Sequence, residues 1–506
     1  MQAIVDYVSD YCESSNIAQL PGICLPSLPD IIGTSKLQYE SDQTLGITVP
    51  VGLYDNPEQQ YQGEIIFEPS RENIYIVGSA QTGKTVMLQT IAYGLIKKYA
   101  PNQVNLYLVD CGSKVLKLFE NSFHVGGVVL SNEEEKCKNL FKLLGTMILQ
   151  RKKILSEKGI GSYLSYLEAG YTDIPLAVVM IDNMAAFKEY FSEQAEEING
   201  LAREAQGVGI SFILTAAISN ALNYKVQANF GKKVVLNCND SGEYSNVFGH
   251  CKETPKEIPG RGLFVLDKKI LEYQTAIFGE SMKESDRSEE LKKFINDRNS
   301  QCTEKAVQIP MIPEHLIMEE SMSVHRELFR QRREIVIGMD FESVKYKTIN
   351  MNLWGCLALI GNTQSRIRFV QNIMQALAQN IVFHEVEAVI IDDRAKPLSI
   401  LKELAFVQAY TNDSEEAMMV ISSFCDGVTK RLQDEDITGR SKKMLIINNT
   451  GVMKKLNADK TIAKELSEAI KMANEADCFL LLANVENQNV GFNSSEVLKT
   501  VKELRQ

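Results

Sequence analysis

The sequence predicts an α/β protein made of two tandem domains, each a doubly wound and mainly parallel sheet. Apolar, β-rich runs alternate with stretches of helical spacing along most of the chain. A glycine-rich loop at residues 78–85 joins one such run to a helix. The order of the strand-like runs then recurs in the second half of the chain, which indicates an internal repeat.

Composition places the chain among globular proteins. The 506 residues suffice for two or more domains, and 44% are hydrophobic and 24% charged. No stretch has the apolar length of a membrane helix and no signal peptide follows Met1, so we expect any membrane anchor on another segment or partner. The formal net charge of −11 argues against a nucleic-acid motor, which needs Lys and Arg to replace phosphate counterions.

The cysteine and histidine patterns predict no metal site. Ten cysteines are scattered without a Cys-x-x-Cys pair, which suits free thiols in a reducing compartment. The five histidines lack the spacing of zinc ligands. We therefore expect neither a disulfide framework nor zinc.

The loop at 78–85 fits the phosphate-binding pattern Gly-x-x-x-x-Gly-Lys-Ser/Thr, the Walker A motif. Its glycines let backbone N–H groups wrap a phosphate at a helix N-terminus. Lys84 would neutralise the outer phosphates, and the Thr85 hydroxyl would bind Mg²⁺. We predict that eight residues bind the phosphates of ATP: Gly78, Ser79, Ala80, Gln81, Thr82, Gly83, Lys84 and Thr85.

Two later strands end in an acidic residue, where ligand-facing groups of an open α/β sheet lie. They are Val104–Asp110 and Leu176–Asp182. The second has the Walker B form, so Asp182 is expected to support Mg²⁺ through its water shell. Asn183 follows, and a neutral amide can orient water but cannot accept its proton. Thr215, near the end of the strand Gly209–Ala216, is either a γ-phosphate sensor or a buried strand threonine.

The remaining elements of the first domain follow the same reasoning. Residues 1–62 are rich in turn signals, such as Leu20-Pro21-Gly22. Spacing and composition predict a helix over Met1–Tyr11 and strands over Val49–Leu53, Glu64–Phe67 and Val234–Cys238. They also predict a helix capped by Ser131 that runs to Ile154, after the stretch His124–Val129. A charged stretch at 280–304 leads to the predicted boundary, which assigns residues 1–305 to the first domain and 306–506 to the second.

The second domain repeats the first in outline, up to a final helix over Ser494–Arg505. Five pairs of segments correspond: Val51–Asp55 with Ile337–Asp340, Asn73–Gly78 with Leu357–Gly361, Leu106–Asp110 with Val389–Asp392, Val178–Asn183 with Leu445–Asn449, and Phe212–Ala216 with Phe479–Ala483. Matching order and spacing over several strands predict a second copy of the same fold.

The chemistry of the loop is not repeated. Gly361–Ile367 contains no Gly-Lys-Thr, and the planar fork of Arg366 does not reproduce a compact ammonium group. The Walker B position holds Asn448, which brings no charge for Mg²⁺. We expect a degenerate domain that serves docking or regulation. The alternative is weak ATP binding without Mg²⁺ chemistry.

At this point the chain resembles the FtsK/SpoIIIE superfamily of P-loop ATPases. More narrowly, it resembles the C-terminal tandem ATPase domains of the type VII secretion ATPases, the EssC/EccC family. The features that carry the narrower resemblance are the lead-in Val49–Pro57 with Gln60, His124–Gly127, Pro259–Gly262, Gln274 and the degenerate second domain. It covers nearly the whole chain and implies two FtsK/RecA-like P-loop domains in a row.

The resemblance implies a part of a membrane-anchored protein-secretion ATPase at the cytoplasmic face of the cell membrane. Its implied cofactors are ATP and Mg²⁺, with Lys84 and Thr85 in the Walker A roles and Asp182 in the Walker B role. Its implied partners are WXG100-type secreted proteins, other secretion-system components, and upstream membrane and ATPase segments of the same protein. It also implies a homo-oligomer, such as a hexamer, in the full assembly. The acidic net charge leads us to expect no nucleic-acid partner.

Two departures from active superfamily members predict slow or regulated hydrolysis. Asn183 stands where those members carry a catalytic Glu, and Ala205-Gln206 replaces a Gly-Arg pair that supplies a trans-acting arginine. The candidate catalytic residues are thus Lys84 and Asp182, with Asn183 and Thr215 in subordinate roles. Two other functions stay open: a DNA translocase, and a scaffold that uses ATP only to fix its shape.

Overall fold

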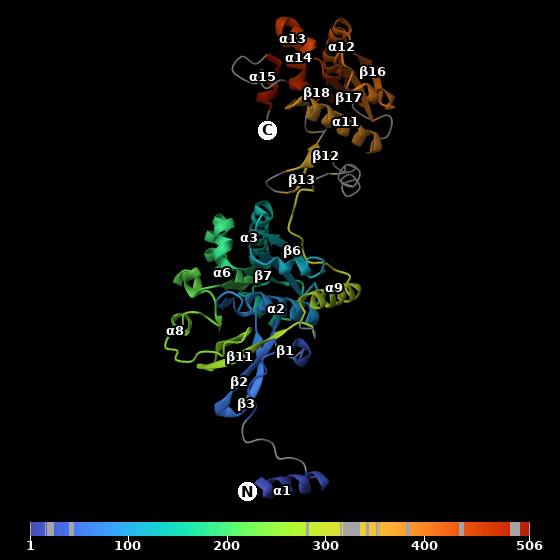
Figure 1. Cartoon of the computed structure of the whole chain (residues 1–506). Coiled ribbons are helices and arrows are strands. Elements are labelled where there is room, and N and C mark those ends of the chain that lie inside the picture. Colours follow the sequence, from blue (N-terminus) through green and yellow to red (C-terminus); the bar gives the residue numbers. More distant parts are fainter. Residues whose placement is uncertain are drawn as a thin grey trace. The chain divides into compact units, whose positions relative to one another are not determined.

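The computed structural model describes residues 2–15, 17, 25–39, 45–279, 283–313, 316, 334–340, 344–350, 353, 355–380, 385–434, 440–485 and 496–504. The chain divides into two compact units, Met1–Met311 and Ile312–Gln506 (Figure 1). Residues 306–311, which the predicted boundary assigns to the second domain, lie in the first unit. The predicted turn at Leu20-Pro21-Gly22 falls outside the described residues. Within them, no helix combines the length and apolar character needed to cross a bilayer.

The first unit is built on one large mixed sheet with the strand order β3-β2-β11-β10-β9-β4-β8-β7-β5-β6, and β1 pairs with β11. From β9 to β6 neighbouring strands are parallel, whereas β3, β2, β11, β10 and β9 pair antiparallel. The strands are β1 Ile32–Gly33, β2 Val49–Asn56, β3 Tyr61–Phe67, β4 Ile74–Val77, β5 Val104–Asp110, β6 Val125–Leu130, β7 Leu176–Asp182, β8 Ile210–Ala216, β9 Lys232–Leu236, β10 Arg261–Leu266 and β11 Lys269–Ile277.

Helices connect the parallel strands, and the central strands β4, β5, β7 and β8 are buried along their whole length, as strands covered on both faces should be. The helices are α1 Gln2–Ser14, α2 Lys84–Lys98, α3 Glu134–Glu157, α4 Tyr163–Glu168, α5 Met184–Tyr190, α6 Ser192–Ala205, α7 Tyr224–Gln227, α8 Gly242–Phe248 and α9 Glu284–Ser300, with a 3-10 turn η3 at Val115–Phe119. The prediction that Ser131 caps α3 is wrong. The helix begins after Glu133, whose carboxylate accepts the N–H of Leu130 and closes a turn before the helix.

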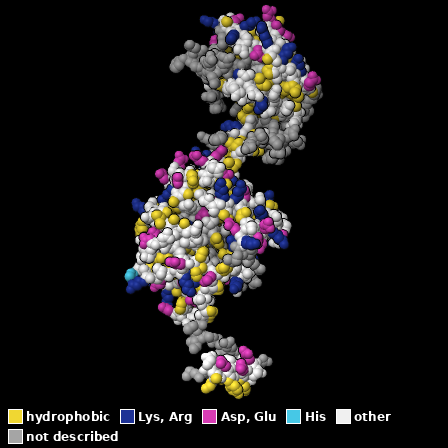
Figure 2. All heavy atoms as spheres, in the orientation of Figure 1, with side chains coloured by type: hydrophobic (Ala, Val, Ile, Leu, Met, Phe, Trp, Pro, Cys, Tyr) yellow, Lys and Arg dark blue, Asp and Glu magenta, His cyan; other side chains and the backbone are white. Residues whose placement is uncertain are grey.

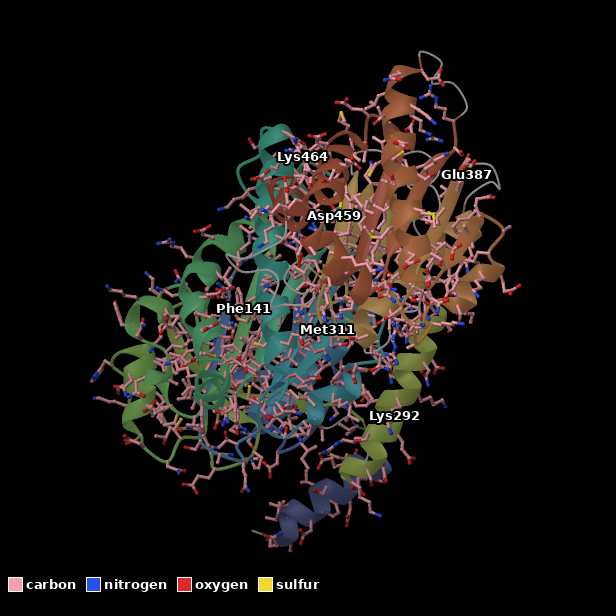
Figure 3. The ribbon with its side chains drawn as sticks, turned by 90° about the horizontal axis from the view of Figure 1, so that it is seen from above. Phe141, Lys292, Met311, Glu387, Asp459 and Lys464 are labelled. Atoms are coloured by element: carbon pink, nitrogen blue, oxygen red, sulfur yellow. The ribbon has the colours of Figure 1, made fainter. Side chains whose placement is uncertain are left out.

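The segment 306–311 lies along β6, the last strand of the sheet. The N–H of Ala306 donates to Phe123 O at 2.7 Å, and that of Ile309 donates to Gly126 O at 2.8 Å. Ala306 and Ile309 are buried. Met311 lies beside α3, the helix that carries Phe141 (Figure 3). The segment therefore covers the edge of the sheet in the first unit.

The second unit repeats the core of this arrangement. Its five-stranded parallel sheet has the order β14-β18-β17-β15-β16, which matches β4-β8-β7-β5-β6. A separate hairpin, β12 with β13, corresponds to β2 with β3. The elements are β12 Glu334–Met339, β13 Tyr346–Asn350, β14 Cys356–Ile360, α11 Thr363–Asn380, β15 Val386–Ile391, η6 Ser399–Glu403, β16 Val407–Thr411, α12 Ser414–Gln433, β17 Lys442–Ile447, α13 Thr450–Ala458, α14 Lys460–Met472, β18 Cys478–Val485 and α15 Glu496–Glu503.

Two details confirm that the second unit is a copy of the same fold. The first is a bulge at equivalent positions of the two hairpins, before Gly52 in β2 and before Gly338 in β12. The second is the burial pattern of β17, where Met444 and Ile446 join one apolar cluster with α11 while Leu445 and Ile447 join another with α12 and α14. Helices thus cover both faces of the sheet, as in a doubly wound fold.

Candidate nucleotide-binding site

The phosphate-binding loop leaves the carboxyl end of β4, between two neighbouring strands. Backbone N–H groups anchor it on both sides: Gly78 donates to Ala216 O at 3.1 Å, and Ser79 donates to Asn237 O at 2.9 Å. Gly78 has no room for a side chain, because a Cβ there would lie 2.8 Å from the Cβ of Leu236. The start of the loop is therefore fixed to the carboxyl ends of the strands on both sides of β4.

The end of the loop needs glycine for a conformational reason. Gly83 has φ = 105° and directly precedes α2. The first intrahelical bond runs from Met87 N to Gly83 O, so the N–H groups of the first turn have no acceptor within the helix. Such a turn attracts phosphate oxygens through its free N–H groups and its dipole.

Lys84 lies across the loop that it is predicted to serve. Its Nζ atom donates to the carbonyl oxygens of Gly78 and Ser79, each at 2.6 Å. Burial lowers the pKa of Lys84, and the nearby charge of Asp182 opposes that shift. The ammonium group is thus held inside the curve of the loop, with a third donor left for a phosphate oxygen.

Asp182, Thr85 and Thr215 form one hydrogen-bonded chain at the carboxyl edge of the sheet. The Thr85 hydroxyl donates to Asp182 Oδ2 at 2.7 Å, and the Thr215 hydroxyl donates to Asp182 Oδ1 at 2.6 Å. The Thr215 oxygen also accepts the N–H of Asn183 at 2.8 Å. Thr215 is fully buried, and its hydroxyl both donates and accepts a hydrogen bond. This suits a residue that positions Asp182.

The carboxylate of Asp182 is costly to bury. Burial raises its pKa, the two threonine hydroxyls lower it, and the neighbouring Asp110 raises it again. In the residues that the structure places, no three His, Cys, Asp or Glu side chains gather as a metal-binding group. Mg²⁺ commonly takes one or two carboxylates plus phosphate oxygens and waters, so the Thr85–Asp182 pair fits it. Bound Mg²⁺ would neutralise charge on the phosphates there.

Asn183 has a structural task that its sequence position does not reveal. Its backbone is left-handed, with φ = 68°, and its Oδ1 accepts the N–H of Ala186 at 3.3 Å to cap α5. Asparagine tolerates this conformation better than most residues. The side-chain carbonyl is therefore committed to the helix cap, which leaves it poorly placed to orient an attacking water.

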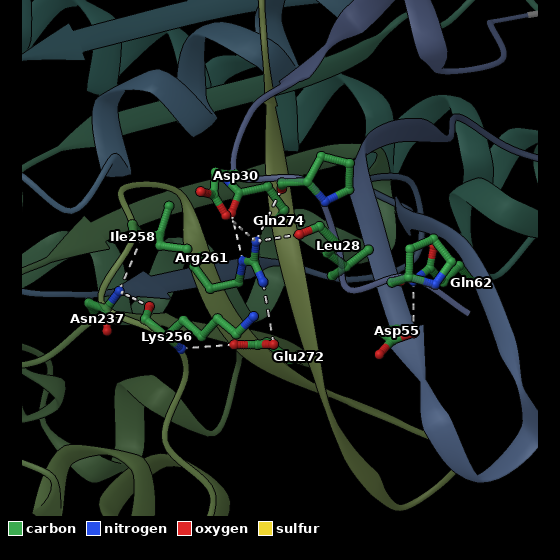
Figure 4. A network of polar contacts seen from close by, with 12 residues as sticks. Leu28, Asp30, Asp55, Gln62, Asn237, Lys256, Ile258, Arg261, Glu272 and Gln274 are labelled. Atoms are coloured by element: carbon green, nitrogen blue, oxygen red, sulfur yellow. Dashed lines mark hydrogen bonds and ion pairs between the residues drawn. The ribbon is translucent and has the colours of Figure 1, made fainter. Parts of the chain in front are cut away.

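A supporting network behind the loop was missed by the sequence reasoning. Gly260 N donates to Thr82 O at 2.8 Å, which ties the turn at 259–262 to the loop. The fully buried Arg261 holds that turn from behind (Figure 4). Its guanidinium donates to Gln274 Oε1 at 2.7 Å and to the carbonyls of Leu28 and Pro29 at 3.1 Å each. The sequence feature that could have revealed this network is the turn Pro259–Gly262 together with Gln274, to which the sequence analysis gave no structural role.

The equivalent place in the second unit lacks a phosphate loop. Only Gly361 and Asn362 separate β14 from α11, whereas six residues, 78–83, separate β4 from α2. The side chain of Asn362 accepts the N–H of Ser365 at 2.8 Å and so caps the helix itself. Arg366 lies at this end, but its guanidinium donates to Ala483 O and to the Thr363 hydroxyl, each at 3.2 Å, so these bonds already occupy donors that a phosphate would need.

Comparison with known proteins shows which family these features resemble. The model of the FtsK/SpoIIIE family matches residues 30–243, a range that contains the phosphate loop, Asp182 and Thr215. The first unit carries an FtsK/SpoIIIE-type domain. The chain is 24% identical over 376 residues to the type VII secretion system protein EssC of Staphylococcus aureus (strain MRSA252), a match that covers 72% of this chain and 25% of EssC. The chain therefore spans about a quarter of the length of this relative.

Solved structures show that the likeness extends past the FtsK domain. A structure of EssC (ATPases 2 and 3) from Geobacillus thermodenitrificans superposes with a TM-score of 0.78 at 22% identity, and covers 95% of this chain and 91% of that one. A structure of Thermomonospora curvata EccC (ATPases 2 and 3) in complex with a signal sequence peptide gives a TM-score of 0.60 at 18% identity, over 96% and 88% of the two chains. The fold is thus that of two tandem ATPase domains, an FtsK domain followed by its degenerate copy.

Proposed function

We propose that this chain forms two cytoplasmic modules of a membrane-anchored type VII protein-secretion ATPase. The first module binds ATP·Mg²⁺ and turns it over slowly or under regulation. The second binds no ATP·Mg²⁺ and docks export substrates of the WXG100 type. Upstream membrane and ATPase segments of the same protein, other secretion-system components and a hexameric assembly complete this proposal, which rests on the similarity to EssC and EccC.

One observation carries the nucleotide assignment. Lys84 and Thr85 begin α2 and Asp182 ends β7, and the three side chains meet beside the end of β4. The second unit has the same strands, yet its loop is too short and its helix is capped by its own Asn362. A single site for ATP·Mg²⁺ therefore falls in the first module.

Calorimetric titration with ATP and Mg²⁺ tests this assignment. The wild-type chain is expected to bind one nucleotide, and Lys84→Ala is expected to abolish the binding. The control is Lys153→Ala, because the Lys153 side chain is 78% exposed on α3. Undiminished binding in Lys84→Ala would overturn the site.

Hydrolysis is expected to be slow because Asn183 supplies no base and its carbonyl caps α5. The same observation favours the second candidate function, a scaffold that ATP stabilises without turnover. Phosphate release by the wild-type chain decides between the two. A rate that Lys84→Ala removes supports the slow ATPase, and a rate equal to that of the variant supports the scaffold.

The charge of the surface favours a protein partner over DNA. The chain has a formal net charge of −11, and on the face shown in Figure 2 basic and acidic side chains are interspersed over the first unit. DNA motors need Lys and Arg to displace counterions, which gives their affinity a steep salt dependence. We expect duplex DNA neither to bind tightly nor to stimulate turnover. A steep salt-dependent affinity would support the DNA translocase instead.

The sheet edges support a docking role for the second module. In the first unit the segment 306–311 covers β6, while β16, the equivalent strand, is the last in its sheet and pairs with no further strand among the described residues. On α12, the helix that follows β16, Met419 is 68% exposed and lies as far from its helix N-cap, Asp413, as Asn139 lies from Glu133 in α3. Asn139 donates to Pro310 O and so holds the covering segment. Exposed strand edges bind extended peptides through their free backbone groups.

This docking role is tested by binding of a purified WXG100-type protein to the immobilised full chain. Met419→Asp is expected to weaken binding, because a charge in place of this exposed apolar side chain opposes an apolar contact. Met472→Asp is the control, since Met472 is also partly exposed but lies at the end of α14. Equal binding by both variants would remove β16 as the docking site.

A further inference from the structure

The first helix of the chain has an apolar face that nothing in the described part of the chain covers. Figure 2 shows hydrophobic side chains gathered on one side of α1, and four of them are more than half exposed: Ile4, Tyr7, Val8 and Tyr11. None of the 13 residues of α1 is buried. A helix of this length is only marginally stable alone in water, so most of its stability must come from packing of its apolar face. The helix α1 therefore needs a partner surface.

The stretch that follows α1 resembles the stretch that follows α9. The segment Leu25–Pro29 matches Ile309–Pro313, with leucine or isoleucine at two places and proline at two others. The central position differs, with Ser27 against Met311. We call α1 with residues 25–27 the α1 element, and α9 with residues 306–311 the α9 element. The chain thus holds two versions of one helix-and-segment element.

The α9 element covers a defined place on the first unit. Leu291 and Ile295 of α9 are buried, and Leu291 lines a cavity beside Thr85 together with Leu118 of η3. Residues 306–311 then continue along β6 and cover the edge of the sheet. Helix and segment therefore act together. The helix covers the turn after β5, and the segment covers the strand after that turn.

The α1 element has apolar residues at the same places, but they are exposed. When the two segments are aligned without a gap, Tyr7 and Tyr11 take the places of the two buried residues of α9. Tyr7 is 71% exposed, and Leu25 is 46% exposed although its counterpart Ile309 is buried. The first unit already has the α9 element at this place, so the α1 element remains for another sheet of the same fold.

The second unit has such a place open. Its turn η6 corresponds to η3, since each turn follows a strand-ending aspartate that accepts a backbone N–H from six residues further on. Ile400 then corresponds to Leu118, which is half-buried, yet Ile400 is 64% exposed. The last helix, α15, packs on α14 instead. Beyond η6, β16 pairs with no further strand in the part of the chain that the structure describes. This unit therefore leaves open the surface that the α9 element covers on the first one.

The charges of the two surfaces are complementary. The charged residues of α1 are all acidic: Asp6, Asp10 and Glu13. From residue 393 to the end of η6, three basic residues and one acidic residue are exposed: Arg394, Lys396, Lys402 and Glu403. Asp393 is half-buried there, so the excess of positive charge is small. This pattern favours docking of α1 at η6 over pairing of two α1 helices or binding to an anionic membrane, since like charges repel.

We propose that the α1 element of one molecule docks on the second unit of another molecule of this chain, with α1 beside η6 and Leu25 at the edge of β16. The contact is head-to-tail, because the two surfaces differ, and each molecule in a pair keeps one surface free for a further molecule. It needs no nucleotide, and it places a second molecule and an export substrate in competition for β16.

Sedimentation velocity of the full chain, without nucleotide or export protein, tests this contact. Over about a hundredfold range of concentration, the average mass of wild type is expected to rise beyond that of a dimer. Tyr11→Asp on α1 and Ile400→Asp on η6 each place a charge in the contact. Each variant is expected to raise the concentration of half-association about tenfold or more. Ser9→Asp is the matched control, because it adds the same charge on the polar side of α1, and it should change that concentration less than about twofold.

A mixture of the two variants tests the head-to-tail geometry. Tyr11→Asp keeps an intact second unit and Ile400→Asp keeps an intact α1, so the mixture is expected to form dimers that grow no further. Wild type that stays monomeric at every concentration would overturn the proposal and leave α1 to another partner. Association of Ile400→Asp equal to that of wild type would also overturn it, as pairing of two α1 helices would give. Neither result would bear on the nucleotide site, since no ligand is present.

Discussion

The side-chain amide of Asn448 donates a hydrogen bond of 2.8 Å to the carboxylate of Asp392. In the first unit the corresponding residues are Asp182 and Asp110, which lie in register on neighbouring parallel strands. Two buried carboxylates thus stand where the second unit has a satisfied amide–carboxylate pair. The first unit keeps an electrostatic cost at this place that its copy has removed, which is typical of a functional site.

Replacement of Asp182 by Asn is expected to stabilise the first unit and to weaken its Mg²⁺-dependent nucleotide binding. The side-chain oxygen of Asn can still accept the Thr215 hydroxyl, and its NH2 group can donate to the Thr85 oxygen. The change also removes a buried charge beside Asp110. A gain of about 1 kcal/mol would raise the midpoint of thermal unfolding by about 2–4 °C. Circular dichroism at pH 7 and calorimetric titration with ATP and Mg²⁺ measure the two effects.

The pH dependence of that gain follows from the direction of the pKa shift. The pKa of Asp182 is raised in the folded state, so its charged form is penalised at neutral pH and the penalty disappears as pH falls through the folded pKa. The stabilisation by Asp182→Asn should therefore be largest near pH 7 and smaller in acid. A gain that grows toward low pH would contradict this account.

The reverse change in the second unit, Asn448→Asp, is expected to destabilise it by about 3 kcal/mol at pH 7. It removes the donor to the fully buried Asp392 and places a second carboxylate against it. The introduced carboxyl would have a raised pKa, so the loss should shrink as pH falls and it becomes protonated. Thermal unfolding followed by circular dichroism at pH 7 and in acid measures the loss and its pH dependence.

Substitution of Asn183 by Glu is expected to raise phosphate release and to lower stability together. A carboxylate supplies the missing base, but Glu loses the cap of α5 and strains the left-handed backbone, at about 1–2 kcal/mol for each effect. Asn183→Asp is the matched variant, since Asp both caps helices and tolerates this conformation. An unchanged rate in both variants would show that more of the hydrolytic machinery than the base is missing.

Removal of Arg261 is expected to damage both the fold and the nucleotide site. Arg261→Met leaves Gln274 and two backbone carbonyls without their buried donor, at a cost of about 3–5 kcal/mol. The turn at 259–262 would then hold the phosphate loop less firmly, so ATP affinity should fall as well. Urea unfolding and calorimetry measure the two effects. Arg203→Met, at a side chain 73% exposed, should change unfolding by less than about 0.5 kcal/mol.

Substitution of Gly126 by Ala is expected to release the segment 306–311 from β6. An added Cβ would lie 2.4 Å from Val307 O and 2.3 Å from the Tyr107 ring. Tryptic cleavage after Lys305 should therefore become several-fold faster, as followed by mass spectrometry. Gly145→Ala on α3 is the control, because a Cβ there meets nothing within 4 Å. Equal cleavage rates in the two variants would show that the segment is not held by this contact.

The parts of the site that local pattern controls were predictable from the sequence. The phosphate loop lies within eight consecutive residues between a strand and a helix, and the two acidic strand ends have a common position. The degenerate repeat was predictable for the same reason. The matching strands keep their order even where the loop between them has lost the residues that bind phosphate. Spacing alone thus sufficed for the tandem fold.

Features that depend on distant pairing could not be predicted. Thr215 reaches Asp182 because β8 lies beside β7, and Arg261 reaches residue 28 across the antiparallel part of the sheet. The cavity beside Thr85 is lined by α2 and α9, which are separated by most of the first unit in sequence. The conformation of Asn183 was hidden too, because the residue type alone does not distinguish a left-handed helix cap from a water-orienting amide.

The segment that covers β6 also has a consequence for synthesis of the chain. Residues 306–311 follow every strand of the first sheet in sequence, so they leave the ribosome last. Until they do, β6 presents unpaired backbone groups and the apolar sites of Ala306 and Ile309 stay open, a condition that favours pairing with another nascent chain. A ribosome that pauses before this segment has left the exit tunnel would therefore expose an aggregation-prone intermediate, whereas emergence of the segment allows the edge of the first domain to close.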